Sequence, residues 1–169
     1  KEMFGFAGWN FIGASSAVLR DQGGNILINM FCGATVNAAR GIAMSVNSAV
    51  YGFVANFMIA LNPQITKNYA SGDYGYMFSL AFQGARLSYY ILLILSLPIF
   101  VTTPYLLHLW LGIVPEHASN FTRLVLLFTM SESLASPLVT IMLATGKIKN
   151  YQLIVGGLQL LNLPISYAV

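Results

Sequence analysis

Charged side chains that could bind a ligand interrupt segments that are otherwise almost wholly apolar. They are Arg20, Asp21, Arg40, Arg86 and Glu132. Insertion scales assign about 2.5 to 3.5 kcal/mol to an Arg or Asp at the centre of a membrane helix, whereas a leucine returns only about 0.3 to 0.6. Such charges should therefore pair, hydrate or meet a ligand. Because three arginines cannot all pair with two carboxylates, an anionic ligand is favoured over the alternative, ion pairs that only set helix packing.

The segment 35–73 combines an apolar helix candidate with a narrow polar stripe. At 100° per residue, about a third of the circumference is shared by Asn37, Arg40, Met44, Asn47, Ser48, Tyr51 and Asn62. A polar stripe narrower than the apolar surface is typical of a membrane helix that faces a wet interior. The candidate cavity residues on this stripe are Asn37, Arg40, Asn47 and Tyr51.

A second polar group lies inside the first apolar segment. Asn25 and Asn29 are one helical turn apart and share a face, whereas Arg20 points elsewhere if the helix is regular. A break at Gly23-Gly24 would change this phase. A solvated loop is the alternative, but flanks of about 16 and 8 residues are too short for two spans. We expect one interrupted span whose Arg20, Asp21, Asn25 and Asn29 line the cavity.

Two later segments each carry one embedded charge. Arg86 shares an arc with Ser79, Gln83 and Tyr90. Glu132 lies near the centre of its segment, and we expect Thr129, Ser133, Ser136 and Thr140 on the same side. A carboxylate in this setting is the candidate for coupling transport to protons or sodium ions.

The composition excludes several classes of protein. Hydrophobic residues make up 57% of the 169 residues and charged residues 8%, against about 25% charged in soluble domains. The net charge of +3 comes from scattered residues without a phosphate-binding loop, so we predict no nucleic-acid partner. No nucleophile stands beside a base, so we expect neither enzymatic activity nor a cofactor. His108 and His117 lack a carboxylate at ligand spacing, which disfavours a metal site.

Hydrophobic patterning predicts an all-α bundle of membrane spans. The expected spans are 4–31, 36–66, 77–110, 117–144 and 151–169. A helix over 36–66 would be about 46 Å long against a hydrocarbon core of about 30 Å, and we place its disturbance at Asn62-Pro63. Pro98 and Pro104 predict a kink in the third span. Because apolar sequence reaches both termini, we expect the chain to be a portion of a longer protein.

Loop charges predict the orientation in the membrane. One side carries Lys1, Lys67, Lys147 and Lys149, whereas the loops on the opposite side, around residues 33 and 112–116, carry no Lys or Arg. Arg123, just inside the fourth span, is the nearby exception. The lysine side is therefore expected to be cytoplasmic.

Several short motifs, in order, resemble a known family. They are Gly8-Trp9-Asn10-Phe11-Ile12-Gly13, Ala38-Ala39-Arg40-Gly41-Ile42-Ala43, Asn62-Pro63-Gln64-Ile65-Thr66-Lys67, Leu109-Trp110-Leu111-Gly112-Ile113-Val114-Pro115 and Ala144-Thr145-Gly146-Lys147. Together they resemble bacterial polysaccharide (O-antigen-type) repeat-unit flippases of the multidrug/oligosaccharidyl-lipid/polysaccharide exporter superfamily. Of the candidate cavity arginines, only Arg40 lies within a matching motif.

The resemblance implies a multi-pass protein of the bacterial cytoplasmic (inner) membrane. The chain would be the C-terminal half of a MATE-like transporter of roughly twelve helices, and the N-terminal helical bundle would complete a central cavity with alternating access. The implied substrate is a lipid-linked oligosaccharide, whose diphosphate passes through the cationic cavity while its polyprenyl tail stays in lipid. Two alternatives are a cation-coupled multidrug exporter of the same fold and a membrane scaffold that does not transport.

Overall fold

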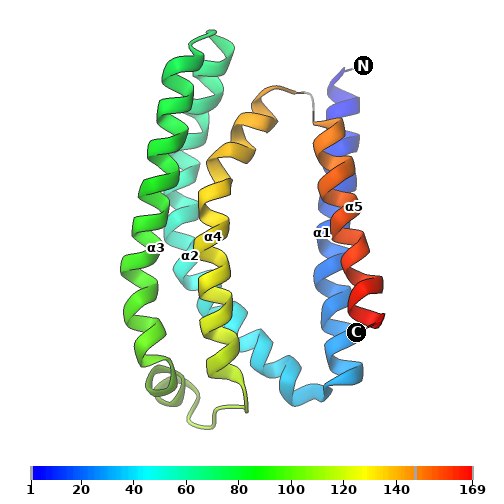
Figure 1. The fold of residues 1–169 in the computed structure, drawn as a ribbon, viewed down its shortest axis with the longest axis vertical. Helices are drawn as coiled ribbons and strands as arrows, with labels where there is room; N and C mark the ends of the chain where they lie inside the picture. Colours follow the sequence, from blue (N-terminus) through cyan, green and yellow to red (C-terminus); the bar gives the residue numbers. More distant parts are fainter. Residues whose placement is uncertain (1, 147, 169) are drawn as a thin grey trace. The chain divides into compact units, whose positions relative to one another are not determined.

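The computed structural model describes residues 2–146 and 148–168, with side chains described from Gly8 onward except at 163 and 168. Over these residues the chain forms five helices and no strand: α1 (Glu2–Phe31), α2 (Gly33–Ala70), α3 (Tyr74–Leu111), α4 (Ala118–Ala144) and α5 (Lys149–Ala168) (Figure 1). The expected all-α fold is confirmed. The predicted orientation rests partly on Lys1 and Lys147, and the predicted fifth span ends at Val169. These three residues lie outside the described residues.

Within the described residues, three helices are long and apolar enough to cross a membrane, judged by length and composition alone. They are α2, α3 and α4. That α1 and α5 also cross stays a prediction.

The turn between α2 and α3 is shorter than the loop expected from Lys67 to Tyr76. Helix α2 continues to Ala70 and α3 begins at Tyr74. Gly72 takes a φ of +78°, a conformation that favours glycine, and the Asp73 carboxylate accepts a hydrogen bond from the Tyr76 N–H at 3.1 Å. This cap starts α3 immediately after the turn.

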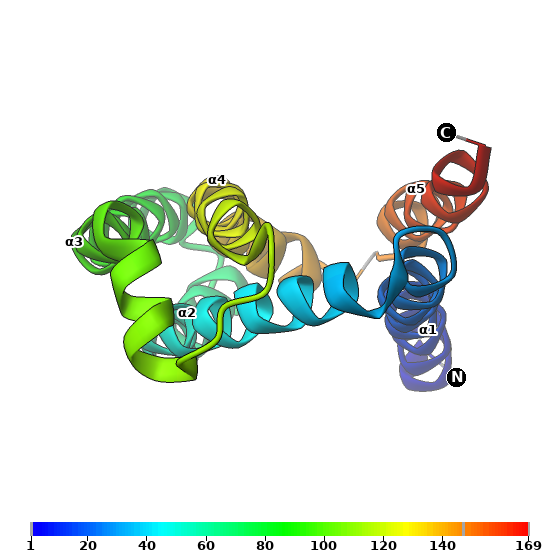
Figure 2. The same cartoon turned by 90° about the horizontal axis from the view of Figure 1, so that it is seen from below.

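Glycine and proline inside the apolar segments do not end the helices. Helix α1 is continuous through Gly23 and Gly24, so the interruption expected there is not formed. Helix α2 continues through Pro63, and α3 through Pro98 and Pro104. A helix in lipid must satisfy its own backbone groups, which opposes a break inside a span. The last turns of α3 nevertheless bend steeply from its first part, as the two prolines predicted (Figure 2).

Helix α2 changes direction in its cyan part, which lies before Pro63 (Figure 1). In this part the Ser45 hydroxyl donates to the Gly41 carbonyl at 3.0 Å and the Ser48 hydroxyl donates to the Met44 carbonyl at 2.8 Å. Hydrogen bonds from serine to the carbonyl four residues earlier often bend helices. Ser45 and Ser48 therefore provide a cause for this bend, which lies away from Pro63.

The helices group into two compact units. Unit 1 comprises residues 1–37 and 145–169, and unit 2 comprises residues 38–144. In unit 1, α1 and α5 run parallel, because the Lys149 ammonium lies 5.7 Å from the centre of the Trp9 ring and the Phe31 and Tyr167 rings lie 5.7 Å apart at the other end. Gly13 allows this approach, because a Cβ there would collide with the Gln152 side chain.

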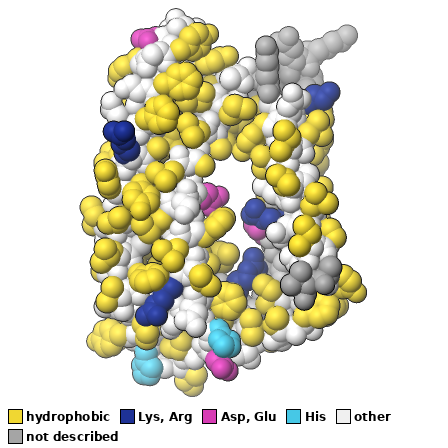
Figure 3. All heavy atoms as spheres, in the orientation of Figure 1, with side chains coloured by type: hydrophobic (Ala, Val, Ile, Leu, Met, Phe, Trp, Pro, Cys, Tyr) yellow, Lys and Arg dark blue, Asp and Glu magenta, His cyan; other side chains and the backbone are white. Residues whose placement is uncertain are grey.

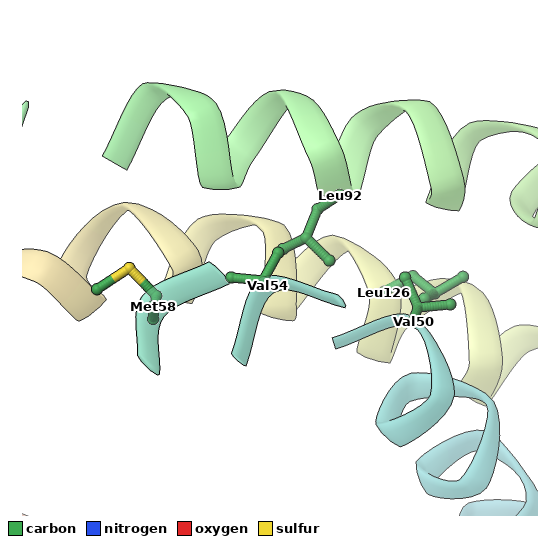
Figure 4. Packing of buried hydrophobic residues seen from close by; sticks show 5 residues of the cluster. All are labelled: Val50, Val54, Met58, Leu92 and Leu126. Carbon is green, nitrogen blue, oxygen red and sulfur yellow. The ribbon is translucent and has the colours of Figure 1, made fainter. Parts of the chain in front are cut away.

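Unit 2 packs α2, α3 and α4 around an apolar interior. Figure 4 shows its central cluster, to which all three helices contribute: Val50, Val54, Met58, Leu92 and Leu126. Helices α3 and α4 lie side by side and antiparallel (Figures 1 and 2). Gly84 on α3 makes room for Leu61 of α2 and faces Pro137 of α4, so a missing side chain again sets a helix contact.

Hydrophobic side chains also cover much of the outer surface (Figure 3). Leu109 is 74% exposed, Phe11 74% and Phe128 67%. Apolar patches of this extent are rare on soluble monomers and suit contact with lipid.

Candidate functional site

In unit 1, Arg20 and Asp21 form an ion pair with each other. The Arg20 Nη2 and Asp21 Oδ1 atoms are 3.0 Å apart, and the side chains are 40% and 56% exposed. An exposed ion pair in water contributes about 0 to 1 kcal/mol to the free energy of unfolding. The pair therefore neutralises two charges but adds little to stability. Asn25 and Asn37 are partly buried, whereas Asn29 is exposed.

In unit 2, the polar stripe of α2 borders the packed face of the helix. Ala39 and Ala43 are completely buried, and Arg40, Asn47 and Tyr51 are partly buried beside that face. The carboxamide oxygen of Asn47 is buried without a hydrogen-bond partner among the described residues. A buried acceptor of this kind calls for a donor from water or a ligand.

Tyr51 has a packing role that the stripe alone does not indicate. Its side chain lies against the central cluster around Val50 and Val54. The ring therefore supports the interior of unit 2. A role in substrate binding would fall to its hydroxyl group.

Arg86 and Glu132 are both exposed, on α3 and α4 respectively. In the described part of unit 2, no ion pair joins them. Each stands beside a residue of the packed face, Arg86 next to Ala85 and Glu132 next to Ser133. Both charges therefore point out of the three-helix packing.

Two of the four polar residues expected beside Glu132 face into the helix packing instead. Thr129 and Ser133 are buried, at 3% and 0% exposure, and the Ser133 hydroxyl donates to the Met130 carbonyl at 2.8 Å. The assumed common side is wrong because these two residues follow the packed face of α4, which Glu132 does not share.

Thr140, the last of that group, links two helices. Its hydroxyl donates to the Asn62 carboxamide oxygen at 2.9 Å, which joins α4 to α2. The sequence analysis identified both residues as polar side chains in apolar helices. It could not predict that they pair, because they lie far apart in the chain.

Arg123 has a position that the sequence reading missed. Its Nε donates to the Phe100 carbonyl at 3.1 Å, and its guanidinium carbon lies 5.5 Å from the centre of the Phe100 ring. Pro104, four residues after Phe100, has no N–H to offer this carbonyl. The Thr103 hydroxyl of the same helix also donates to this carbonyl, at 3.2 Å, so Arg123 is a second donor that comes from another helix. The spacing Phe100–Pro104 was the available signal, since it leaves the carbonyl without its usual backbone donor.

This arrangement defines a polytopic, all-helical membrane protein with charged and amide side chains on its helix faces. Comparison with protein-family models matches residues 22–168 to MatE. The chain therefore belongs to the MatE family and is a membrane transporter of the MATE superfamily. Proteins of this family are transporters and not enzymes. Neither the search of curated proteins nor the search of solved structures finds a match.

Proposed function

We propose that the chain flips polyprenyl-diphosphate-linked oligosaccharide repeat units across the bacterial cytoplasmic membrane. In this proposal it acts by alternating access, together with an N-terminal helical bundle of the same protein. The ordered motifs that resemble polysaccharide flippases support the choice of substrate over the drugs carried by other exporters.

The observation that carries the proposal is the charge balance inside the helices. Arg20 and Asp21 neutralise each other at 3.0 Å. The candidate charges comprise three arginines, Arg20, Arg40 and Arg86, and two carboxylates, Asp21 and Glu132, so by count the set keeps a net positive charge. A diphosphate is a suitable counter-charge, because planar guanidinium groups bind phosphate oxygens through paired, charge-assisted hydrogen bonds.

The asparagine side chains and Tyr51 would bind the sugar units of the substrate. The unpartnered oxygen of Asn47 can accept a hydrogen bond from a sugar hydroxyl. Asn25, Asn29, Asn37 and the Tyr51 hydroxyl offer further donors and acceptors. The polyprenyl chain, in contrast, requires only lipid.

A cation-coupled drug exporter of the same fold is the second candidate, with Glu132 as its coupling residue. The carboxylate is exposed on an apolar helix and has no ion-pair partner in the described part of the chain. A proton or a sodium ion could occupy it during the cycle. The same residue could also drive flipping, so Glu132 bears on the coupling and not on the substrate.

The test is a substitution series at Arg40 in the full-length protein. Vesicle flipping of a lipid-linked oligosaccharide should decline from arginine to Arg40→Lys to Arg40→Ala, with Lys67→Ala, at the exposed end of α2, as the matched control. A purely structural Arg40 would instead lower the amount of folded protein, and removal of a partner carboxylate should then restore it. Unchanged flipping at unchanged abundance would contradict the proposal.

The two substrates are separated by two further observations. Drug efflux without oligosaccharide flipping would favour the exporter. Glycosyltransferase genes beside the coding sequence would favour the flippase. In either case Glu132→Gln should impair transport without lowering abundance, and normal transport would leave Glu132 without a coupling role.

A further inference from the structure

An apolar groove lies between α3 and α4, with a volume of about 190 Å³. Its lining includes Leu93, Leu97 and Phe100 from α3 and Leu127 and Met130 from α4. Leu97 is 57% exposed and Leu127 50%, so the groove is open along one side. Ser96 also lines it, and its hydroxyl is buried without a hydrogen-bond partner among the described residues.

One end of this groove carries a cation. Phe100 forms part of the lining, and Arg123 contacts both its carbonyl, at 3.1 Å, and its ring, at 5.5 Å from the centre. Only the Nε donor of the guanidinium is used in the bond to Phe100. The Nη donors remain, and no Asp or Glu of the described residues forms an ion pair with Arg123.

The register of the two helices gives the groove a direction. Arg123 stands five residues after the start of α4, about 8 Å along the helix, which places it near the membrane interface on the side of the 112–117 loop. Because α3 and α4 are antiparallel, the lining runs from Phe100 and Leu127 to Leu93 and Met130, about 10 Å farther toward the middle of the span. A cation at the interface followed by an apolar groove complements a phosphate headgroup followed by a hydrocarbon chain.

We propose that Arg123 and the α3–α4 groove form a binding site for an anionic phospholipid of the leaflet on the side of the 112–117 loop. The guanidinium binds the phosphate through its Nη donors, and one acyl chain lies along Leu97 and Leu127. The Nε bond to Phe100 positions the guanidinium at the mouth of the groove. This site is independent of the proposed transport substrate.

The experiment is native mass spectrometry of the purified full-length protein, titrated with phosphatidylglycerol or with phosphatidylcholine of the same chains. The wild-type protein should retain phosphatidylglycerol more tightly. Arg123→Gln should lower that affinity roughly tenfold, as expected for loss of charge-assisted hydrogen bonds, while Lys67→Gln should leave it unchanged. Glycerol phosphate, which has the headgroup chemistry without a chain, should not compete.

A second variant keeps the test valid if Arg123→Gln folds poorly. Leu97→Trp fills the groove and should reduce retention of phosphatidylglycerol. Ile94→Trp is the matched control, because Ile94 is 69% exposed on the same helix and does not line the groove. Equal affinity for both lipids, competition by glycerol phosphate, or full retention in Leu97→Trp would each overturn the proposal.

Discussion

The two units of this transporter hold their helices together by different means. In unit 1, small and polar residues meet: Gly13 admits the Gln152 side chain, Gln152 donates to Asn10 at 3.4 Å, and Gly156 lies against Ser16. In unit 2, large aliphatic side chains from three helices fill a common interior. The α1–α5 contact of unit 1 therefore depends on small residues, whereas unit 2 combines one such contact, at Gly84, with an interior filled by large side chains.

The difference reflects how helices associate in lipid. Lipid tails are as apolar as leucine, so close packing and interhelical hydrogen bonds must drive association. Helix α1 carries many polar residues and can associate through them at short range. Helices α2 to α4, the three that meet the requirements of a membrane span, achieve close packing by interdigitating branched side chains.

The largest expected loss of stability follows from removing a buried side chain in unit 2. Leu92→Ala should lower the free energy of unfolding by about 2 to 5 kcal/mol, because Leu92 is 1% exposed and its removal leaves a cavity. SDS titration of the full-length protein in micelles measures this. Ile94→Ala, at a 69% exposed position, should cost much less, and equal costs would refute the packed interior.

The converse change applies to unit 1. Gly13→Leu should destabilise the α1–α5 pair by roughly 1 to 3 kcal/mol, since the added side chain must displace Gln152 or separate the helices. Gly8→Leu is the control, because a Cβ at Gly8 meets no atom within 4 Å. The same SDS titration compares them. If the Gly13 variant is as stable as the Gly8 variant, the α1–α5 contact does not depend on a small residue at position 13.

A smaller effect is expected for the polar link within unit 2. Thr140→Val removes the hydrogen bond to Asn62 and should cost about 0.6 kcal/mol and at most about 1.7. Thr102→Val is matched to it, because the Thr102 hydroxyl bonds only to the Pro98 carbonyl of its own helix. If the two variants have the same free energy of unfolding, the hydrogen bond between α2 and α4 does not contribute to stability.

The last prediction concerns topology rather than stability, and asks whether unit 1 crosses the membrane as unit 2 does. The native Cys32 is exposed and should react with an impermeant maleimide from outside intact cells. In a Cys32→Ser background, Glu116→Cys should also react, whereas Ser71→Cys and Lys149→Cys should react only after permeabilisation. Labelling of Lys149→Cys from outside would show that the orientation is wrong.

Patterns local to a helix were readable from the sequence. The ranges of the five helices follow from runs of apolar residues, and the bend of α3 follows from Pro98 and Pro104. Several local predictions failed, among them the loop expected over 67–76 and the disturbance expected at Asn62-Pro63, through which α2 continues. Helix α1 is continuous at Gly23-Gly24, where an interruption was predicted, and Thr129 and Ser133 near Glu132 lie in the packed face of α4.

The sequence by itself determined that this protein is a helical membrane protein, since 8% charged residues cannot form a surface exposed to water. It also identified which side chains are too costly to face lipid. Only the tertiary structure decided how those side chains are used: Arg20 is paired with Asp21, Asn62 with Thr140, and Arg123 with the Phe100 carbonyl, which Pro104 leaves without a backbone donor. Periodicity assigns a residue to a face of its own helix, but the partner of that face depends on packing between segments distant in the chain.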